Sequence, residues 1–278
     1  MHAIPTRLAA IATFLAGAAA LAGLVFTGLY VDAPNWAQQA RGTDLATLFF
    51  AVPVLAVGLW ASTRGSSVGR LAVAAGLLYL VYNYAIFAFA VAMNPLTAVH
   101  IAIFGLSLWS LVLSGRTAIE GSCEVSEGLN RRSAGGLLIG VAVIFGLLWL
   151  GQIATASTTG ILPPDLIKAG ISSNPVYALD LAFFLPLCAL AGIGLLRRNA
   201  AAAAYAFPML VWVGLMGAGV VGGFLLMAAA GDLVAVPVVV VISGLSVASS
   251  ILAAIALVRP GSVTGLARTS PRPAHLEG

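Results

Sequence analysis

The chain has 278 residues, of which 61% are apolar and only 8% charged, and its mean hydropathy is +1.06. Soluble domains carry roughly 25% charged residues, so this composition excludes an ordinary soluble domain and indicates an integral membrane protein. The formal net charge of +4 arises from twelve arginines and one lysine, with no basic run that interleaves with aromatic residues, and therefore does not indicate a nucleic-acid partner.

Eight apolar runs follow one another along the chain, each bounded by charged residues, Pro or Gly. A transmembrane helix needs about 20 mostly apolar residues to cross a hydrocarbon core of roughly 30 Å, at a rise of about 1.5 Å per residue. The runs cover approximately residues 8–30, 44–61, 71–93, 95–114, 134–155, 175–196, 203–229 and 234–258. The sequence therefore predicts an all-α polytopic membrane protein with eight transmembrane helices.

The basic residues predict the orientation of these helices. With a cytoplasmic N-terminus, eleven arginines fall in cytoplasmic segments and only Arg41 and Lys168 fall on the other side, as the positive-inside rule requires. The first apolar run exceeds the roughly 7–15 residues of a signal-peptide core, so we expect a retained helix. We therefore expect a multi-pass protein of the bacterial cytoplasmic (inner) membrane, with both termini in the cytoplasm.

The eight helices divide into two halves of four. The expected segments are a first half at residues 1–115, a cytoplasmic linker at 116–133, a second half at 134–258 and a disordered cytoplasmic tail at 259–278. The linker holds Glu120, Glu124 and Glu127 between basic flanks. Because it lacks the partner residues that catalysis would need, we interpret it as a solvated connection.

Three pairs of short stretches suggest that the second half repeats the first. "GLVFTG" from Gly23 resembles "GLLWLG" from Gly146, and "GLSLWS" in the fourth run resembles "GLSVAS" in the eighth. "DLATLFF" from Asp44 likewise resembles "DLAFFLP" from Asp180. Four spans in each half give both halves the same orientation, so we expect a parallel 4+4 repeat about an axis along the membrane normal, with Asp44 aligned to Asp180.

Three titratable residues lie within or at the edge of apolar runs. Asp180 lies six residues after Asn174 in "NPVYALDLAFFLP", and Asn-Pro predicts a helix start because Asn is a favoured N-cap and Pro suits the first turn. His100 lies six residues after Asn94, which also precedes Pro, and Asp44 opens the second run. Too few residues follow each of the three to cross the bilayer core, so we expect all three in its outer quarter.

A charged aspartate costs roughly 2.5–3.5 kcal/mol at the bilayer centre and less near the edge, so such residues usually face the protein interior or a wet cavity. In "LLYLVYNYAIF", the amide of Asn83 also needs several partners. The candidate ligand-binding residues are Asp180, Asp44, His100, Asn83, Tyr79, Tyr82 and Tyr177. For each, the alternative is a purely structural hydrogen bond. We expect the helices at 71–93, 95–114 and 175–196 to meet near the outer face, with Asp180 turned inward.

Other chemistry has weaker signals. No established nucleotide, hydrolase or metalloprotease motif occurs, and we predict neither a metal site nor a cofactor. Cys123 and Cys188 lack metal or redox spacing. The runs Gly219-x-x-x-Gly223 and Gly136-x-x-x-Gly140 are typical of close helix packing, either within the chain or in an oligomer.

Three function hypotheses remain open. The first is the binding or transport of a small molecule or ion through an outward-facing polar pocket in the lipid bilayer. The second is a membrane-embedded enzyme that uses Asp180 and His100 as acid and base. The third is an accessory membrane subunit without chemistry of its own.

The stretches "SSNPVYALDLAFFLP", followed by "GLLRR", and "YNYAIFAFAVAMNPL" resemble a group of uncharacterised multi-pass bacterial integral membrane proteins. The resemblance covers about a third of the chain. It implies an all-helical integral membrane protein and carries no activity, cofactor or site residue with it.

Overall fold

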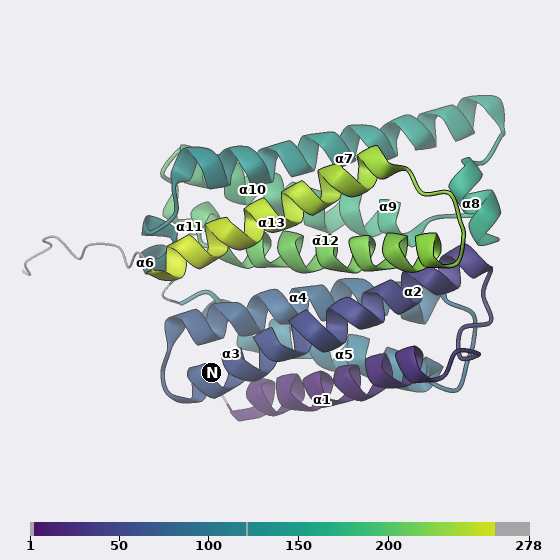
Figure 1. Cartoon of the computed structure of the whole chain (residues 1–278). Helices are drawn as coiled ribbons and strands as arrows, with labels where there is room; N and C mark the ends of the chain where they lie inside the picture. Colours follow the sequence, from purple (N-terminus) through teal and green to yellow (C-terminus); the bar gives the residue numbers. More distant parts are fainter. Residues whose placement is uncertain (1–2, 121, 259–278) are drawn as a thin grey trace, which may run out of the picture.

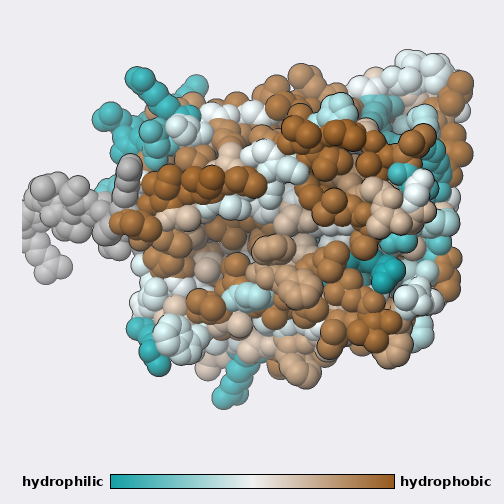
Figure 2. Space-filling model, in the orientation of Figure 1, coloured by the Kyte–Doolittle hydropathy of each residue, from teal (hydrophilic) through white to brown (hydrophobic). Residues whose placement is uncertain are grey.

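Helices long and apolar enough to cross a membrane make up most of the computed structural model, which describes residues 3–120 and 122–258. There are eight such helices, and no strand occurs among the described residues. The predictions of an all-α fold and of eight spans are therefore confirmed, and the chain has the architecture of a multi-pass membrane protein. In the space-filling view, apolar residues cover most of the visible bundle and hydrophilic residues lie mainly towards its two ends (Figure 2).

The spans are α1 (Ala3–Val25), α2–η1–α3 (Pro34–Thr63), α4 (Ser67–Ala90), α5–η2 (Thr97–Ala118), α7 (Arg131–Thr159), α9–η3–α10 (Pro175–Leu196), α11–α12 (Ala200–Ala229) and α13 (Val236–Val258). Within the composite spans, the elements are α2 (Pro34–Ala46), η1 (Thr47–Ala51), α3 (Val52–Thr63), α5 (Thr97–Ser114), η2 (Gly115–Ala118), α9 (Pro175–Leu179), η3 (Asp180–Phe184), α10 (Leu185–Leu196), α11 (Ala200–Ala203) and α12 (Ala206–Ala229). Two short helices connect spans: α6 (Ser122–Glu127) and α8 (Pro164–Ala169).

The two parts of the bundle meet where α12 packs on α2 and α4. Helices α1 to α5 lie on one side and α7 to α13 on the other, with α4 and α12 between them (Figure 1). Over the most apolar stretch of 18 residues, the share of buried residues is 72% in α4 but only 11% in α7 and in α13. Helix α6 lies at one end of the bundle and α8 at the other, and we call these the α6 end and the α8 end (Figure 1).

A short π-helix interrupts the span that contains Asp44 and the span that contains Asp180. These segments are η1 and η3, and each is followed by a helix of twelve residues with Pro in its second position, Pro53 in α3 and Pro186 in α10. Proline lacks an N–H and clashes with the carbonyl one turn earlier, and a π-helical turn accommodates this break in the hydrogen-bond ladder.

The turns after these two helices also match. Arg64 and Arg197 are the C-caps, and the next residues, Gly65 and Arg198, both have positive φ. Ser66 and Asn199 then cap the following helices through their side chains. All these pairs differ by 133 in residue number, as do the two π-helices.

This register differs from the one expected from the sequence. The match of "DLATLFF" with "DLAFFLP" pairs Asp44 with Asp180, whereas the π-helices pair Thr47 with Asp180. The local backbone is set by Pro and the turn, and not by the repeated Asp-Leu letters, so Asp44 lies three residues earlier in its helix than the position that corresponds to Asp180.

Of the two helix starts predicted at Asn-Pro pairs, one is confirmed and one is wrong. The start at Asn174-Pro175 is confirmed, because the Asn174 side chain accepts a hydrogen bond from the N–H of Val176 at 2.9 Å. The start at Asn94-Pro95 is wrong by two residues, because α5 begins at Thr97. Asn94 instead caps a preceding turn: its side chain accepts from Leu96 N–H, and its own N–H donates to the hydroxyl of Thr97.

The linker is more tightly packed than expected. Val125 and Leu129 are buried, and the hydroxyl of Ser126 donates to the carbonyl of Ala203 at 2.9 Å, so α6 lies against the bundle. The buried residues recur at helical spacing, so one face of the segment packs while Glu127 stays exposed. The predicted tail at 259–278 lies outside the described residues.

Glycines allow the closest helix contacts. Gly42 of α2 lies directly against Gly223 of α12, since a Cβ at Gly42 would stand 2.1 Å from the Gly223 nitrogen. Gly219 also faces α2, so the packing role predicted for Gly219 and Gly223 is confirmed within one chain. A Cβ at Gly136 or Gly140 would meet no atom of another described helix within 4 Å, so these two glycines make no such close contact within the chain.

Candidate functional site

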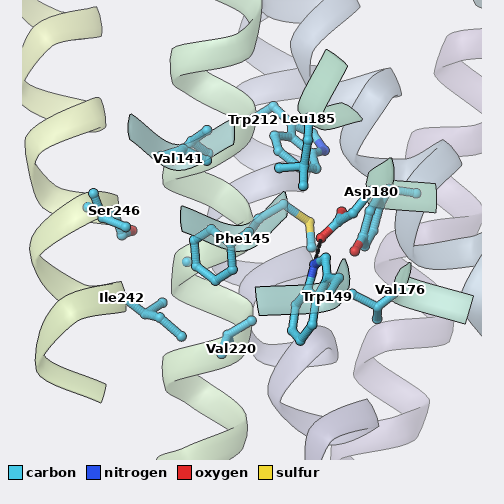
Figure 3. Close-up of a pocket in the computed structure, with 15 residues that line it drawn as sticks. Val141, Phe145, Trp149, Val176, Asp180, Leu185, Trp212, Val220, Ile242 and Ser246 are labelled. Carbon is cyan, nitrogen blue, oxygen red and sulfur yellow. Dashed lines mark hydrogen bonds between the residues drawn. The ribbon is translucent and has the colours of Figure 1, made fainter. Parts of the chain in front are cut away.

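A cavity of about 110 Å³ lies in the second half of the chain, between α7, α12 and α13 (Figure 3). The π-helix η3 and the central helix α4 complete its wall, and most of the lining side chains are apolar. Among the described residues that line it, Asp180 is the one with an acidic side chain and none is basic. Ile242 and Ser246 of α13 lie across the cavity from Asp180 (Figure 3).

Two neutral groups hold the carboxylate of Asp180. The indole N–H of Trp149 in α7 donates to its Oδ2 at 2.7 Å (Figure 3). The hydroxyl of Tyr82 in α4 lies close enough to share a hydrogen bond with the carboxylate. Asp180 is 7% exposed, so the prediction that it turns inward is confirmed.

Aromatic rings surround the carboxylate on the α4 and α12 sides. The Tyr82 ring meets Phe184 edge-on at 4.9 Å and Trp212 at 5.5 Å, and Phe184 stacks on Trp212 at 4.8 Å. The indole nitrogen of Trp212 is buried and has no hydrogen-bond acceptor among the described residues. These rings fix Tyr82 and leave one unpaired donor in the pocket lining.

A second aromatic pair lies between the carboxylate and the α8 end of the bundle. Trp149 stacks on Tyr177 with ring centroids 4.9 Å apart, and the Tyr177 hydroxyl donates to the side-chain oxygen of Gln152. Tyr177 was a predicted site residue, and here it contacts the tryptophan that binds Asp180 rather than Asp180 itself.

The helices that flank the pocket are loosely attached near that same end. Residues 143–159 of α7 and 236–248 of α13 include no buried residue. Long apolar side chains on both helices are exposed, for example Leu147 at 66% and Val240 at 63%. In a bilayer these segments face lipid, so the side of the pocket between α7 and α13 faces the membrane interior rather than water.

Asp44 forms a separate buried cluster in the first half. It is 1% exposed, and the hydroxyl of Tyr30 donates to its Oδ2 at 2.6 Å. Gly23 of α1 faces this pair so closely that a Cβ would lie 2.0 Å from Oδ2. Burial and the neighbouring Asp44 raise the pKa of the Tyr30 phenol, so Tyr30 remains a protonated donor. Arg41 lies near enough to interact with Asp44 by charge.

His100 lies in the first turn of α5, packed among aromatic rings. Its ring is 4.7 Å from that of Phe87 and 5.7 Å from that of Tyr84, and its Nδ1 is buried without a described partner. Helix α5 packs on α1 and α4, and His100 does not line the pocket that holds Asp180. The expected meeting of three spans is therefore seen in part: α4 contacts both α5 and α9, whereas the main contacts of α5 are with α1, α4 and η2. The arrangement does not pair Asp180 with His100 as acid and base.

Of the remaining candidates, Tyr79 is hydrogen-bonded within the first half, and Asn83 also contacts the second half. Tyr79 shares a hydrogen bond with the hydroxyl of Thr47 at 3.1 Å. The Asn83 amide donates to the carbonyl of Tyr79 at 3.0 Å and to the sulfur of Met216 at 3.3 Å. Both side chains therefore have structural partners, which is the alternative interpretation, and neither reaches the carboxylate of Asp180.

Sequence reasoning missed three residues that complete the two acidic clusters. Tyr30 stands only at the end of the first apolar run, and neither Trp149 nor Trp212 was among the predicted site residues. Trp149 had one usable signal, since it lies in the "GLLWLG" stretch that suggested a repeat. No sequence signal indicates which indole reaches which carboxylate.

The described residues contain no group of three or more His, Cys, Asp or Glu side chains close enough to hold a metal ion. A comparison of the chain with known proteins finds no matching family model, no matching curated protein and no matching solved structure.

Proposed function

We propose that this protein binds a small amphiphilic molecule in the pocket around Asp180 and transfers it between the membrane and the external side. The observation that carries the proposal is a carboxylate placed at the edge of an otherwise apolar cavity inside the bundle. Apolar pockets with a few polar groups are typical of small-ligand sites. An intramembrane acidic residue without an ion-pair partner is also most often functional.

The membrane setting is part of the same proposal. We place the chain in a bacterial inner membrane, with the α6 end and both termini in the cytoplasm and the α8 end outside. The arginine bias supports this orientation, since Arg64 and Arg197 end helices opposite to the segment with Lys168.

We further propose that the two halves are parallel repeats. Support comes from the matched π-helices, twelve-residue helices and turns at a register of 133 residues. At that register Asn83 corresponds to Met216, and these two side chains contact each other. Such a contact is expected for equivalent positions beside a pseudo-twofold axis, so we propose an axis between α4 and α12.

Native mass spectrometry of the protein purified from bacterial membranes in dodecyl maltoside tests the function. We expect a bound small molecule on the wild type and on Val240→Trp, whose side chain faces lipid. Ile242→Trp, two residues away on the pocket wall, should lose it because the larger ring fills the cavity. Equal retention by both variants would show that the pocket is not the binding site.

Cysteine labelling tests the orientation. In a background with Cys123 and Cys188 replaced by serine and alanine, Lys168→Cys should react with a membrane-impermeant maleimide in intact cells. Arg64→Cys and Arg197→Cys should react only after the membrane is permeabilised. Labelling of Arg64→Cys in intact cells would contradict the proposed topology.

A further inference from the structure

We propose that the pocket binds the positively charged head of an amphiphile, a quaternary ammonium or protonated amine, which enters from the outer leaflet between α7 and α13. This inference rests on the proposed function and names the chemical class of its ligand. It follows from the charge, the ring content and the position of the pocket.

The charge of the pocket is unbalanced. Trp149 and Tyr82 are both neutral donors, and no basic side chain lines the cavity. Asp44, the comparable buried carboxylate, has Arg41 within the reach of its charge. A buried charge is stable only when it is paired and hydrogen-bonded. For the carboxylate of Asp180 in its ionised form, a ligand cation supplies the partner that the described residues do not.

The aromatic content of the wall favours the same ligand. Tyr82, Phe145, Trp149 and Trp212 all line the cavity. The faces of such rings attract cations, and tryptophan does so most strongly, with an energy of about 2 kcal/mol or more where water is excluded. An anionic head would be repelled by the carboxylate and by the same ring faces.

The size and position of the pocket define the rest of the ligand. Its volume of about 110 Å³ is well below the roughly 300–1,000 Å³ of sites that enclose a whole drug-sized molecule. It therefore accommodates a small head while an apolar tail stays outside. The tail has a route between α7 and α13, since residues 143–159 and 236–248 include no buried residue and their exposed side chains face lipid.

Isothermal titration calorimetry in dodecyl maltoside, with empty micelles as the blank, tests the inference. The probes are decyltrimethylammonium, 1-undecanol and decanoate, which share a chain of similar length and differ in the charge of the head. We expect the cation to bind about tenfold more tightly than the alcohol, and decanoate to bind least. Asp180→Asn should weaken binding of the cation about tenfold or more and leave binding of the alcohol unchanged.

Two matched controls accompany these variants. Asp44→Asn removes the other buried carboxylate, which lies outside the pocket, and Val240→Trp adds bulk on the lipid-facing side of α13. Both should bind all three probes as the wild type does. Ile242→Trp should abolish binding of each probe that uses the pocket.

The outcomes separate the two proposals. If all three probes bind alike and Ile242→Trp blocks them all, the pocket binds amphiphiles but the cation inference is overturned. The same holds if decanoate binds best, or if Asp180→Asn leaves cation binding unchanged. If no probe is affected by Ile242→Trp, the proposed function itself fails. Only a cation preference that needs both Asp180 and an open pocket supports the inference.

Discussion

In the half of the chain from α1 to α5, the first and fourth helices, α1 and α5, pack against each other, and the buried carboxylate of Asp44 is enclosed by Tyr30 and Gly23. In the other half, the first and fourth helices, α7 and α13, make few contacts with each other, and a cavity lies between them. Asp180 there borders open volume instead of a glycine. A buried aspartate is a structural element in one half and a candidate site in the other.

This difference shows that burial alone does not identify a functional acid. Asp44 is less exposed than Asp180, at 1% against 7%, yet every side of its pair with Tyr30 is filled by the protein. What distinguishes Asp180 is the adjoining cavity and the absence of a basic residue among those that line it. The comparison can be tested at corresponding sites of the two halves.

The largest expected effect comes from the two glycines that suggested the repeat. A Cβ at Gly23 would stand 2.0 Å from the Asp44 carboxylate and 2.6 Å from the Tyr30 hydroxyl, whereas a Cβ at Gly146 would meet only Leu185 at 4.0 Å. Gly23→Ala should therefore lower the free energy of unfolding by about 3 kcal/mol, since it overpacks the site and breaks the hydrogen bond. Gly146→Ala should leave it unchanged or raise it by up to about 1 kcal/mol.

Unfolding in mixed maltoside and dodecyl sulfate micelles measures both values. Similar losses for Gly23→Ala and Gly146→Ala would mean that the two halves are equally filled. The contrast between a closed and an open half would then be lost.

A smaller effect is expected from the two donors to the carboxylates. Tyr30→Phe leaves the almost fully buried carboxylate of Asp44 without its hydrogen-bond donor. It should lower the free energy of unfolding by about 1–3 kcal/mol. Trp149→Phe should lower the free energy of unfolding by about 1 kcal/mol, because Tyr82 remains beside Asp180 and the carboxylate borders a cavity. Double-mutant cycles with Asp44→Asn and Asp180→Asn isolate the two couplings. A stronger coupling for Trp149 than for Tyr30 would reverse the structural ranking of the two pairs.

The sequence predicts the features that depend on neighbouring residues. Eight apolar runs give eight spans, because the length of a run decides whether it can cross the bilayer. Asn174 and Pro175 give a correct helix start by the same local logic. Asp180, Tyr82 and Tyr177 were among the predicted site residues and do lie at or beside the pocket.

The features that depend on how helices pack could not be predicted. His100 and Asp180 both follow an Asn-Pro pair at the same spacing, yet α5 packs on α1 while the Asp180 helix packs on α7. The cavity itself lies between α7, α12 and α13, and the mostly apolar sequences of these helices do not mark where the space is left. Likewise the register of 133 depends on π-helices and turns, whose hydrogen bonds the repeated letters do not reveal.

The smallest expected effect concerns the two turns that define this register. Gly65 has φ of 85° and Arg198 has φ of 56°, so both occupy the left-handed region that glycine tolerates and other residues disfavour. A non-glycine residue there costs roughly 1–2 kcal/mol, whereas glycine costs roughly 0.5–1 kcal/mol through the greater freedom of the unfolded chain. Gly65→Ala should therefore lower the free energy of unfolding by about 1 kcal/mol, and Arg198→Gly should raise it by about 0.5 kcal/mol.

Gly28→Ala is the control, since Gly28 is not among the glycines with positive φ and a Cβ there would have open space around it. Changes of opposite sign in the free energy of unfolding for Gly65→Ala and Arg198→Gly, measured in the same mixed micelles, would support equivalent turns in the two halves. A loss of stability in Arg198→Gly would show that the arginine side chain makes a contact in its turn that Gly65 has no means to make, and the two turns would then be alike in backbone only.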